Sequence, residues 1–194
     1  MNETDLIEIR CLKGDERQGA YVPIARDYLG EESLETWSGE RRANPELTVG
    51  CFLPGQLIGL CYGLPDPPDG VILDGIAMLD RYAGRGFGSR LLQYFDRQIE
   101  RAGYTVCSLG SAGGYVEHFY TKNGYRPGKF AFWVPSDFDL SPRLKSKYRI
   151  TDTPKNDGTR RLSVEIDHLD NDLRDRLKID VGVDDIISIM YKQF

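Results

Sequence analysis

The sequence predicts an α/β fold, with a mixed and mostly antiparallel central sheet that is flanked by helices. Two pairs of apolar segments each lie on either side of a short turn, a pattern typical of β-hairpins with antiparallel strands. Between these pairs come an apolar strand, a glycine-rich turn, an amphipathic segment and another apolar strand. That order indicates a β-α-β unit, whose two strands are parallel.

The N-terminal part predicts one strand and two helices. Residues 6–12 alternate apolar and polar side chains, as in a half-buried strand. Asp15 is placed to cap a helix over residues 16–29, which Gly30 would close. Residues 31–42 form a second, more polar helical pattern.

The first hairpin joins strands over residues 47–52 and 56–63 around a Pro-Gly turn. The next strand, residues 71–79, is a nearly continuous apolar run, as expected of a central strand that is buried on both faces. Asp74 and Gly75 interrupt this run. A glycine inside a strand often marks a bulge or a close backbone approach, so we expect one here.

The β-α-β unit continues with apolar residues at helical spacing from Phe87 to Ala102, before Gly103. A short strand follows over residues 104–109, then a helix over residues 115–123 and a strand over residues 130–134. The remaining chain predicts a loop over 135–147, a hairpin with strands 148–152 and 159–166, a helix over 171–177 and a last strand over 186–191.

The composition limits the classes of function. The 194 residues carry a formal net charge of -5, and the pI of about 5.1 leaves no basic excess to neutralise a nucleic acid. An acidic protein suits a cationic substrate such as an amine. No apolar run approaches the ~20 residues of a membrane span, and no signal peptide opens the chain. We therefore expect no nucleic-acid partner, no membrane partner and a cytoplasmic location.

The four cysteines do not predict a metal site. Cys11, Cys51, Cys61 and Cys107 are not spaced as ligand pairs, and the chain has only two histidines. Because three of the four lie in apolar runs, we expect buried thiols in a reducing compartment and no bound metal.

The glycine-rich turn Ala83-Gly84-Arg85-Gly86-Phe87-Gly88 predicts an anion site. The first N–H groups of a helix have no intrahelical partner, and the helix dipole adds partial positive charge there. Glycines allow the backbone to approach an anion closely. The turn lacks the Gly-Lys-Ser/Thr ending of a Walker loop and the glycine spacing of a dinucleotide fingerprint. A plain tight turn is the alternative interpretation.

Residues 76–92 (IAMLDRYAGRGFGSRLL) resemble motif A of the GNAT superfamily of acyl-CoA N-acyltransferases. Ala83 departs from that motif, because the family usually has Gln or Arg there. The resemblance implies that the turn binds the pyrophosphate of CoA and that the preceding bulged strand pairs with the pantetheine arm at a splayed parallel strand pair. The implied cofactor-binding residues are Ile76, Ala77, Met78, Gly84, Arg85, Gly86, Phe87, Gly88 and Ser89. Arg81 would join Arg85 at the phosphates, or both are solvated surface residues.

Residues 118–125 (HFYTKNGY) resemble a second block of the family, Phe-Tyr-x-x-x-Gly-Phe, in the expected order and distance. The resemblance implies that Tyr120 is the general acid that protonates the leaving thiolate, although Tyr120 also fits a core position. Gly113 occupies the place of a family asparagine that contacts CoA. Glu117 and His118 could relay a proton through water, but surface positions are the simpler interpretation for both.

Asp74 is the candidate general base. It is the carboxylate inside the predicted central strand, where burial would raise its pKa toward a useful value. The alternative is a carboxylate that bonds to backbone N–H groups beside the bulge.

The family normally ends in a hairpin of its sixth and seventh strands. The resemblance therefore implies an acyltransferase core over residues 1–134, an insertion over 135–183 and a final core strand over 184–194. The insertion would shape the amine pocket or form a homodimer contact. A separate appended subdomain is the alternative.

The implied activity is transfer of an acetyl group from acetyl-CoA to a primary amine by direct attack in a ternary complex. No covalent nucleophile is needed, because the thioester is already activated. The acceptor could be a small amine, an antibiotic, a peptide N-terminus or a lysine side chain. Two rival hypotheses are a non-catalytic acyl-CoA-binding or regulatory module, and a nucleotide-binding protein of another class.

Overall fold

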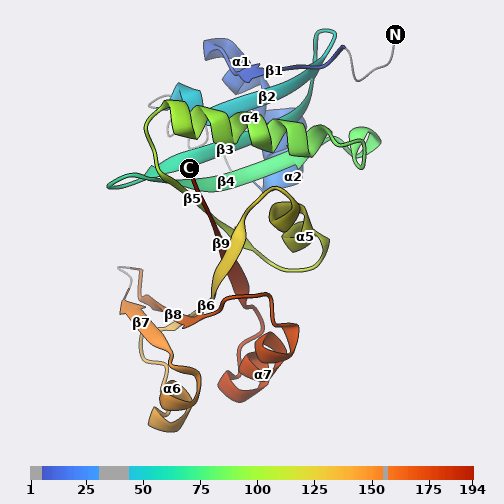
Figure 1. Cartoon of the computed structure of the whole chain (residues 1–194). Coiled ribbons are helices and arrows are strands. Elements are labelled where there is room, and N and C mark those ends of the chain that lie inside the picture. Colours follow the sequence, from blue (N-terminus) through green and yellow to red (C-terminus); the bar gives the residue numbers. More distant parts are fainter. Residues whose placement is uncertain (1–5, 31–43, 155–156) are drawn as a thin grey trace. The chain divides into compact units, whose positions relative to one another are not determined.

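The computed structural model describes residues 6–30, 44–154 and 157–194 (Figure 1). The chain forms two compact units, Met1–Ser108 with Gln193–Phe194, and Leu109–Lys192. The helix expected over residues 31–42 lies outside the described residues.

The first unit contains a sheet with the strand order β1-β2-β3-β4-β5. Its strands are β1 (Glu8–Cys11), β2 (Thr48–Leu53), β3 (Gln56–Asp66), β4 (Gly70–Met78) and β5 (Val106–Ser111). Neighbours from β1 to β4 are antiparallel, whereas β4 and β5 are parallel. The predicted mixed sheet, the hairpin of β2 and β3 and the parallel pair are therefore confirmed.

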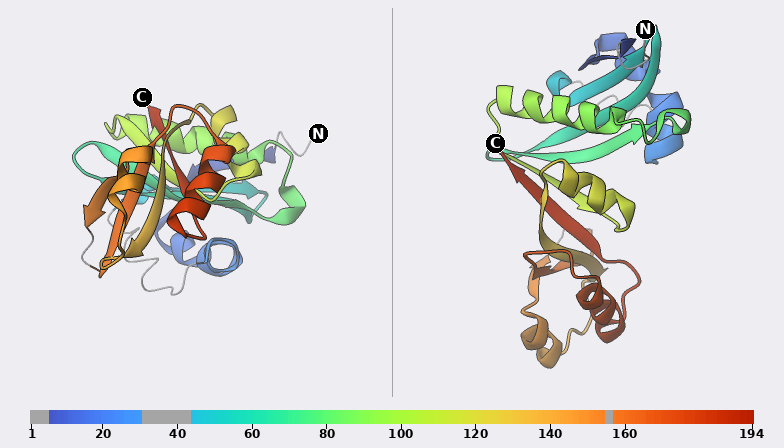
Figure 2. Two further views of the ribbon diagram at one scale, coloured as in Figure 1. Left: turned by 90° about the horizontal axis from the view of Figure 1, so that it is seen from below. Right: turned by 45° about the vertical axis from the view of Figure 1, so that its right-hand side comes forward.

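Helices cover both faces of this sheet (Figure 2). On one face lies α4 (Phe87–Arg101), and on the other lie α1 (Gly14–Gly19), the π-helical turn η2 (Tyr21–Arg26) and α2 (Asp27–Leu29). Two short 3₁₀ turns, η3 (Pro45–Leu47) and η4 (Asp80–Tyr82), connect the elements.

The helix expected from residue 16 starts earlier than predicted. Asp15 lies inside α1, so the prediction that Asp15 caps the helix is wrong. Instead, the carboxylate of Glu16 accepts the backbone N–H of Lys13 at 2.9 Å. Pro23 lies within η2, and its missing N–H is consistent with a break in the regular α-helical bonding there.

The predicted apolar face of α4 is buried against the sheet. Its buried apolar residues are Phe87, Leu91, Leu92, Phe95 and Ile99. A Cβ atom at Gly63 of β3 would lie 2.8 Å from the ring of Phe95. The glycine therefore lets this ring reach the sheet, where burial of such a side chain contributes roughly 1.5–3 kcal/mol.

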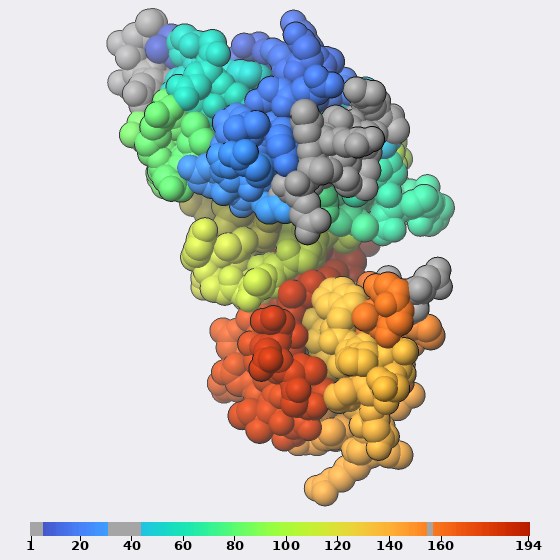
Figure 3. All heavy atoms as spheres, turned by 180° about the vertical axis from the view of Figure 1, so that it is seen from behind, coloured from blue at the N-terminus to red at the C-terminus, as the bar shows by residue number. Residues whose placement is uncertain are grey.

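The second unit includes the last residues of β5, from Leu109 on, and its strand order is β5-β9-β6-β8-β7. Its further elements are α5 (Tyr115–Lys122), β6 (Arg126–Pro135), α6 (Pro142–Tyr148), β7 (Thr151–Pro154), β8 (Thr159–Glu165), α7 (Asn171–Val181) and β9 (Ile187–Gln193). Segments of this unit, coloured yellow to red, pack against one another in Figure 3. Its core includes Phe130, Phe132, Tyr148, Leu162, Leu177 and Ile186. The predicted hairpin of β7 and β8 is confirmed.

Two expectations about local structure were wrong. Residues 142–148 form α6 rather than a loop, because Ser141 accepts the N–H of Leu144 and Pro142 occupies the first turn. Strand β4 is not buried on both faces, since Ile72 is 38% exposed and Asp74 is also exposed. An apolar run alone does not reveal which face a helix covers.

Candidate functional site

Strands β4 and β5 pair over only a short distance. The parallel register joins Gly70 to Val106, Val71 to Cys107 and Ile72 to Ser108. Beyond Ile72, β4 continues to Met78, but the register with β5 has ended. The edge of β4 beyond Ile72 thus offers backbone N–H and C=O groups to a ligand in the way that an edge strand does.

Asp74 is the extra residue of a bulge in β4. Tyr62 pairs with Gly75 and Gly63 pairs with Leu73, so Asp74 has no counterpart in the register of β3. A Cβ atom at Gly75 would lie 2.7 Å from the buried ring of Tyr62. The expected bulge and close approach are therefore confirmed.

The side chain of Asp74 is exposed, so the expectation that it is buried is wrong. Alternation along β4 explains this outcome. Val71 and Leu73 are buried while Ile72 and Asp74 point to the other face. Because the side chain is exposed, burial does not prepare Asp74 as a base.

The glycine turn leads from β4 into α4. Gly84 and Gly86 have φ angles of +74° and +81°, a region that L-residues rarely adopt. Gly86 is the N-cap residue of α4 and, as a glycine, has no side chain of its own to cap the helix. Because the first-turn N–H groups of a helix lack intrahelical acceptors, those of Phe87 and Gly88 are placed to bind an anion.

Backbone hydrogen bonds support this turn where the family motif has a Gln or Arg side chain. The N–H of Tyr82 donates to the carbonyl of Leu79 at 2.8 Å, and the N–H of Ala83 donates to Asp80 at 3.0 Å. The guanidinium carbons of Arg81 and Arg85 lie 5.1 and 5.6 Å from the ring centroid of Tyr82. Both cations therefore lie beside the turn and add positive charge to its surroundings.

The three residues of β4 that are expected to meet the pantetheine arm lie at the strand's C-terminal end. Ile76, Ala77 and Met78 are partly buried and pair with β3 along one edge. The side chain of Met78 lies over Gly59, where a Cβ atom would meet its sulfur at 2.2 Å. The backbone of these three residues thus pairs with β3 on one side of the strand. On the other side, they lie beyond the part of β4 that pairs with β5.

Tyr120 belongs to the second unit, whereas Asp74 and the glycine turn belong to the first. Its side chain is buried, with edge-on ring contacts to Phe119 at 5.2 Å and Tyr125 at 5.8 Å between centroids. Its packing fits the core position, and its role as an acid stays a prediction.

Glu117 is buried, which corrects the expectation of a surface position, whereas His118 is exposed. The carboxylate of Glu117 accepts hydrogen bonds from Arg174 and Ser188. Sequence reasoning missed these two partners. A serine inside the apolar segment IISIMY was the one local signal for this cluster.

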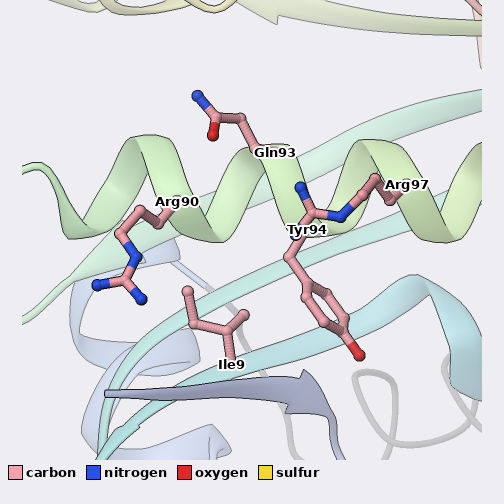
Figure 4. A pocket seen from close by; sticks show the side chains of 5 residues that line it. All are labelled: Ile9, Arg90, Gln93, Tyr94 and Arg97. Atoms are coloured by element: carbon pink, nitrogen blue, oxygen red, sulfur yellow. The ribbon is translucent and has the colours of Figure 1, made fainter. Parts of the chain in front are cut away.

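Two surface hollows lie outside the predicted site. One of about 280 Å³ lies beside α4 and β1 and is lined by Ile9, Arg90, Gln93, Tyr94 and Arg97 (Figure 4). The other, of about 440 Å³, lies between β8 and α7 and includes Glu165, Asp167 and His168.

Within the described ranges, no cluster of His, Cys, Asp and Glu side chains could hold a metal ion. Helices of the described parts are too short or too polar to span a membrane.

All four cysteines are free thiols, as expected, and three of them are buried. Burial raises the pKa of the Cys51 thiol to about 11, and it raises the pKa of Cys61 well above its usual value. Both sulfurs are therefore neutral at physiological pH and poor nucleophiles.

Comparison with known proteins agrees with this geometry. Residues 46–127 match the family described as "Acetyltransferase (GNAT) domain". Comparison with curated protein sequences gives no match.

Three solved structures share the fold at low sequence identity. Naa50 of Arabidopsis thaliana, in complex with the bisubstrate analogue CoA-Ac-MVNAL, is 12% identical with a TM-score of 0.60, covering 97% of this chain and 99% of that one. A GNAT family acetyltransferase from Elizabethkingia anophelis with acetyl-CoA bound is 15% identical with a TM-score of 0.57, covering 98% and 99%. The ribosomal-protein-S18-alanine N-acetyltransferase of Escherichia coli is 16% identical with a TM-score of 0.54, covering 84% and 96%. Residues 46–127, which include β4 and the glycine turn, are therefore similar to the GNAT acetyltransferase domain.

Proposed function

We propose that this protein transfers an acetyl group from acetyl-CoA to a primary amine by direct attack within a ternary complex. One observation carries the proposal: the β4 edge, no longer paired with β5 beyond Ile72, lies just before a glycine turn that enters a helix whose N-cap residue is Gly86. A diphosphate needs such N–H groups, and an extended amide chain needs such a strand edge.

In this proposal the cofactor lies along the first unit. The turn from Gly84 to Ser89 holds the diphosphate through backbone N–H groups, and Arg85 adds charge. The backbone of Ile76 to Met78 pairs with the amides of the pantetheine arm. These assignments rest on the positive φ of Gly84 and Gly86 and on the part of β4 that lies beyond its pairing with β5.

The chemical step needs a neutral amine and a proton for the departing thiolate. We assign the base to Asp74, whose side chain is exposed, and we propose that it acts through a water molecule. We assign the acid to Tyr120, whose ring is fixed by its neighbours.

The acidic net charge favours cationic amines as acceptors. Peptide N-termini are one candidate acceptor class, because the Arabidopsis relative was solved with a peptide-containing analogue. The free thiols fit a reducing, cytoplasmic setting.

A ligand screen tests the first half of the proposal. Acetyl-CoA at 100 times its Kd stabilises the folded state by about 2.7 kcal/mol. In a chain of this size that raises Tm by roughly 5–10 °C. NAD and ATP serve as comparison ligands, and equal or greater stabilisation by either would contradict a CoA site.

Replacing Tyr120 by Phe tests the second half. The ring contacts remain, so CoA binding and Tm stay close to those of the wild type. Turnover, followed as thiol release with a panel of amines, falls by about 100-fold, near the lower end expected for loss of a general acid. Undiminished turnover would remove Tyr120 from the mechanism. A wild-type protein that binds CoA without turnover on any amine would favour the regulatory-module hypothesis.

A further inference from the structure

A buried charged cluster joins three elements of the second unit. Arg174 of α7 donates from Nη2 to Glu117 of α5 and, at 2.5 Å, to the hydroxyl of Ser188 in β9. That hydroxyl donates in turn to the Glu117 carboxylate. The side chains of Arg174 and Glu117 are only 9% and 4% exposed. The cluster therefore links α5 to a helix that lies 57 residues further along the chain.

The surroundings of the guanidinium hold it closely. It lies 4.8 Å from the ring centroid of Phe130. On another side, a Cβ atom at Gly113 would approach Nη1 to 2.8 Å, and Gly113 has a φ of +108°. The position where the family has an asparagine is thus a glycine that makes room for Arg174. Gly113, two residues before α5, therefore lies against this cation.

Stability alone does not account for the cluster. Burying an ion pair costs desolvation energy, and apolar side chains of similar size are often equally or more stabilising. The Nε of Arg174 is also buried without a hydrogen-bond partner among the described residues. Such a pair is better explained by the unique geometry that it imposes on the elements it connects.

The element whose geometry matters here is α5. Two of its eight residues are buried, Glu117 and Tyr120. They are three positions apart and so lie on the same helix face. The orientation of this short helix, and with it the direction of the Tyr120 hydroxyl, therefore depends on how Glu117 is held.

We propose that Arg174 is a positioning residue that orients α5 and thereby sets the place of the Tyr120 hydroxyl. This inference rests on the proposed function, in which Tyr120 is the acid. It assigns a role to the segment 135–183, which contributes Arg174 from outside the region that matches the family.

The test removes both charges together, because removing one alone would leave the other buried and unpaired. The variant Glu117→Leu/Arg174→Met is expected to fold with a Tm within about 5 °C of the wild type and to bind CoA within about twofold. Its kcat falls at least tenfold while KM for acetyl-CoA stays unchanged. Amide hydrogen exchange across α5 becomes faster. Arg174→Lys, which keeps the charge but loses the planar fork, gives an intermediate kcat.

The matched control is Asp180→Asn on the same helix. Asp180 accepts hydrogen bonds from Lys147 and Tyr148 of α6, so its loss loosens α7 without touching α5. We expect wild-type kcat and wild-type exchange of α5 amides for this control.

The double substitution is repeated in a Tyr120→Phe background. A residue that acts through Tyr120 causes no further loss there, because the effects are not additive. Wild-type kcat in the folded double variant, or an equal loss in both backgrounds, overturns the positioning role but leaves the acid role of Tyr120 intact. If the double variant does not fold, the Arg174→Lys variant decides instead. Wild-type kcat and wild-type amide hydrogen exchange of α5 in that variant overturn the positioning role. Full turnover of Tyr120→Phe overturns both proposals.

Discussion

The N-cap residue of α4 offers a direct test of the anion site, through the substitution Gly86→Ala. Gly86 has a φ of +81°, and a Cβ atom there would meet no atom within 4 Å. The cost to folding is therefore conformational, roughly 1–2 kcal/mol for an L-residue in this region. In a chain of this size we expect a fall in Tm of about 2–8 °C.

The same substitution should weaken CoA binding. If the turn relaxes toward negative φ, the N–H groups of Phe87 and Gly88 no longer converge on the diphosphate. A hydrogen bond to a charged group contributes about 1.5–3 kcal/mol, so Kd rises by about 10- to 150-fold for one lost bond. Isothermal titration calorimetry measures Kd, and differential scanning fluorimetry measures Tm.

Gly103→Ala is the matched control at the other end of α4. Gly103 has a φ of +87° and equally open surroundings, so it should lose a similar amount of stability while keeping the wild-type Kd for CoA. A wild-type Kd in Gly86→Ala, or an equal loss of affinity in both variants, would refute diphosphate binding by the turn.

Three further predictions concern stability and reactivity. A hydrogen bond from Arg10 lowers the pKa of the Glu16 carboxyl to about 2. The pair therefore stabilises the folded state fully above about pH 4.3, the pKa of glutamate in the unfolded chain. This stabilisation is lost as the pH falls toward 2. After solvent screening the effect is about 1 kcal/mol, and urea titrations from pH 2.5 to 7 should show a flatter pH dependence for Glu16→Gln. Gly75→Ala should lower the free energy of unfolding by about 1–3 kcal/mol, because the new methyl group overpacks against the Tyr62 ring. Urea titrations should show a smaller loss when the same substitution is made in a Tyr62→Leu background. Equal losses in both backgrounds would exclude the ring clash. Cys51, whose pKa is raised to about 11, should resist a thiol reagent at pH 8 until urea unfolds the chain; rapid labelling of the native protein at this residue would contradict its burial.

Local sequence was sufficient where short-range physics decides the structure. The spacing of apolar residues from Phe87 to Ile99 predicted the buried face of α4, and the glycines before it predicted a tight turn, in which Gly84 and Gly86 have positive φ. Gly75 predicted the bulge of β4. The same approach failed for α6, because a loop was expected over residues 135–147 although Pro142 is well suited to the first turn of a helix.

Within the candidate site, the tertiary structure decided those features that depend on contacts with residues far along the chain. The sequence of β4 predicted a strand, but where β5 stops pairing with it, and that Asp74 is exposed, depend on how the two strands and the helices pack. The burial of Glu117 depends on Arg174 and Ser188, which lie 57 and 71 residues away. By itself, the sequence determined the strands, the glycine turn and the helix that follows it, because these depend on backbone preferences and periodicity over a few residues. Only the folded chain decided which charges are buried and paired, because desolvation and ion pairing depend on contacts between distant segments.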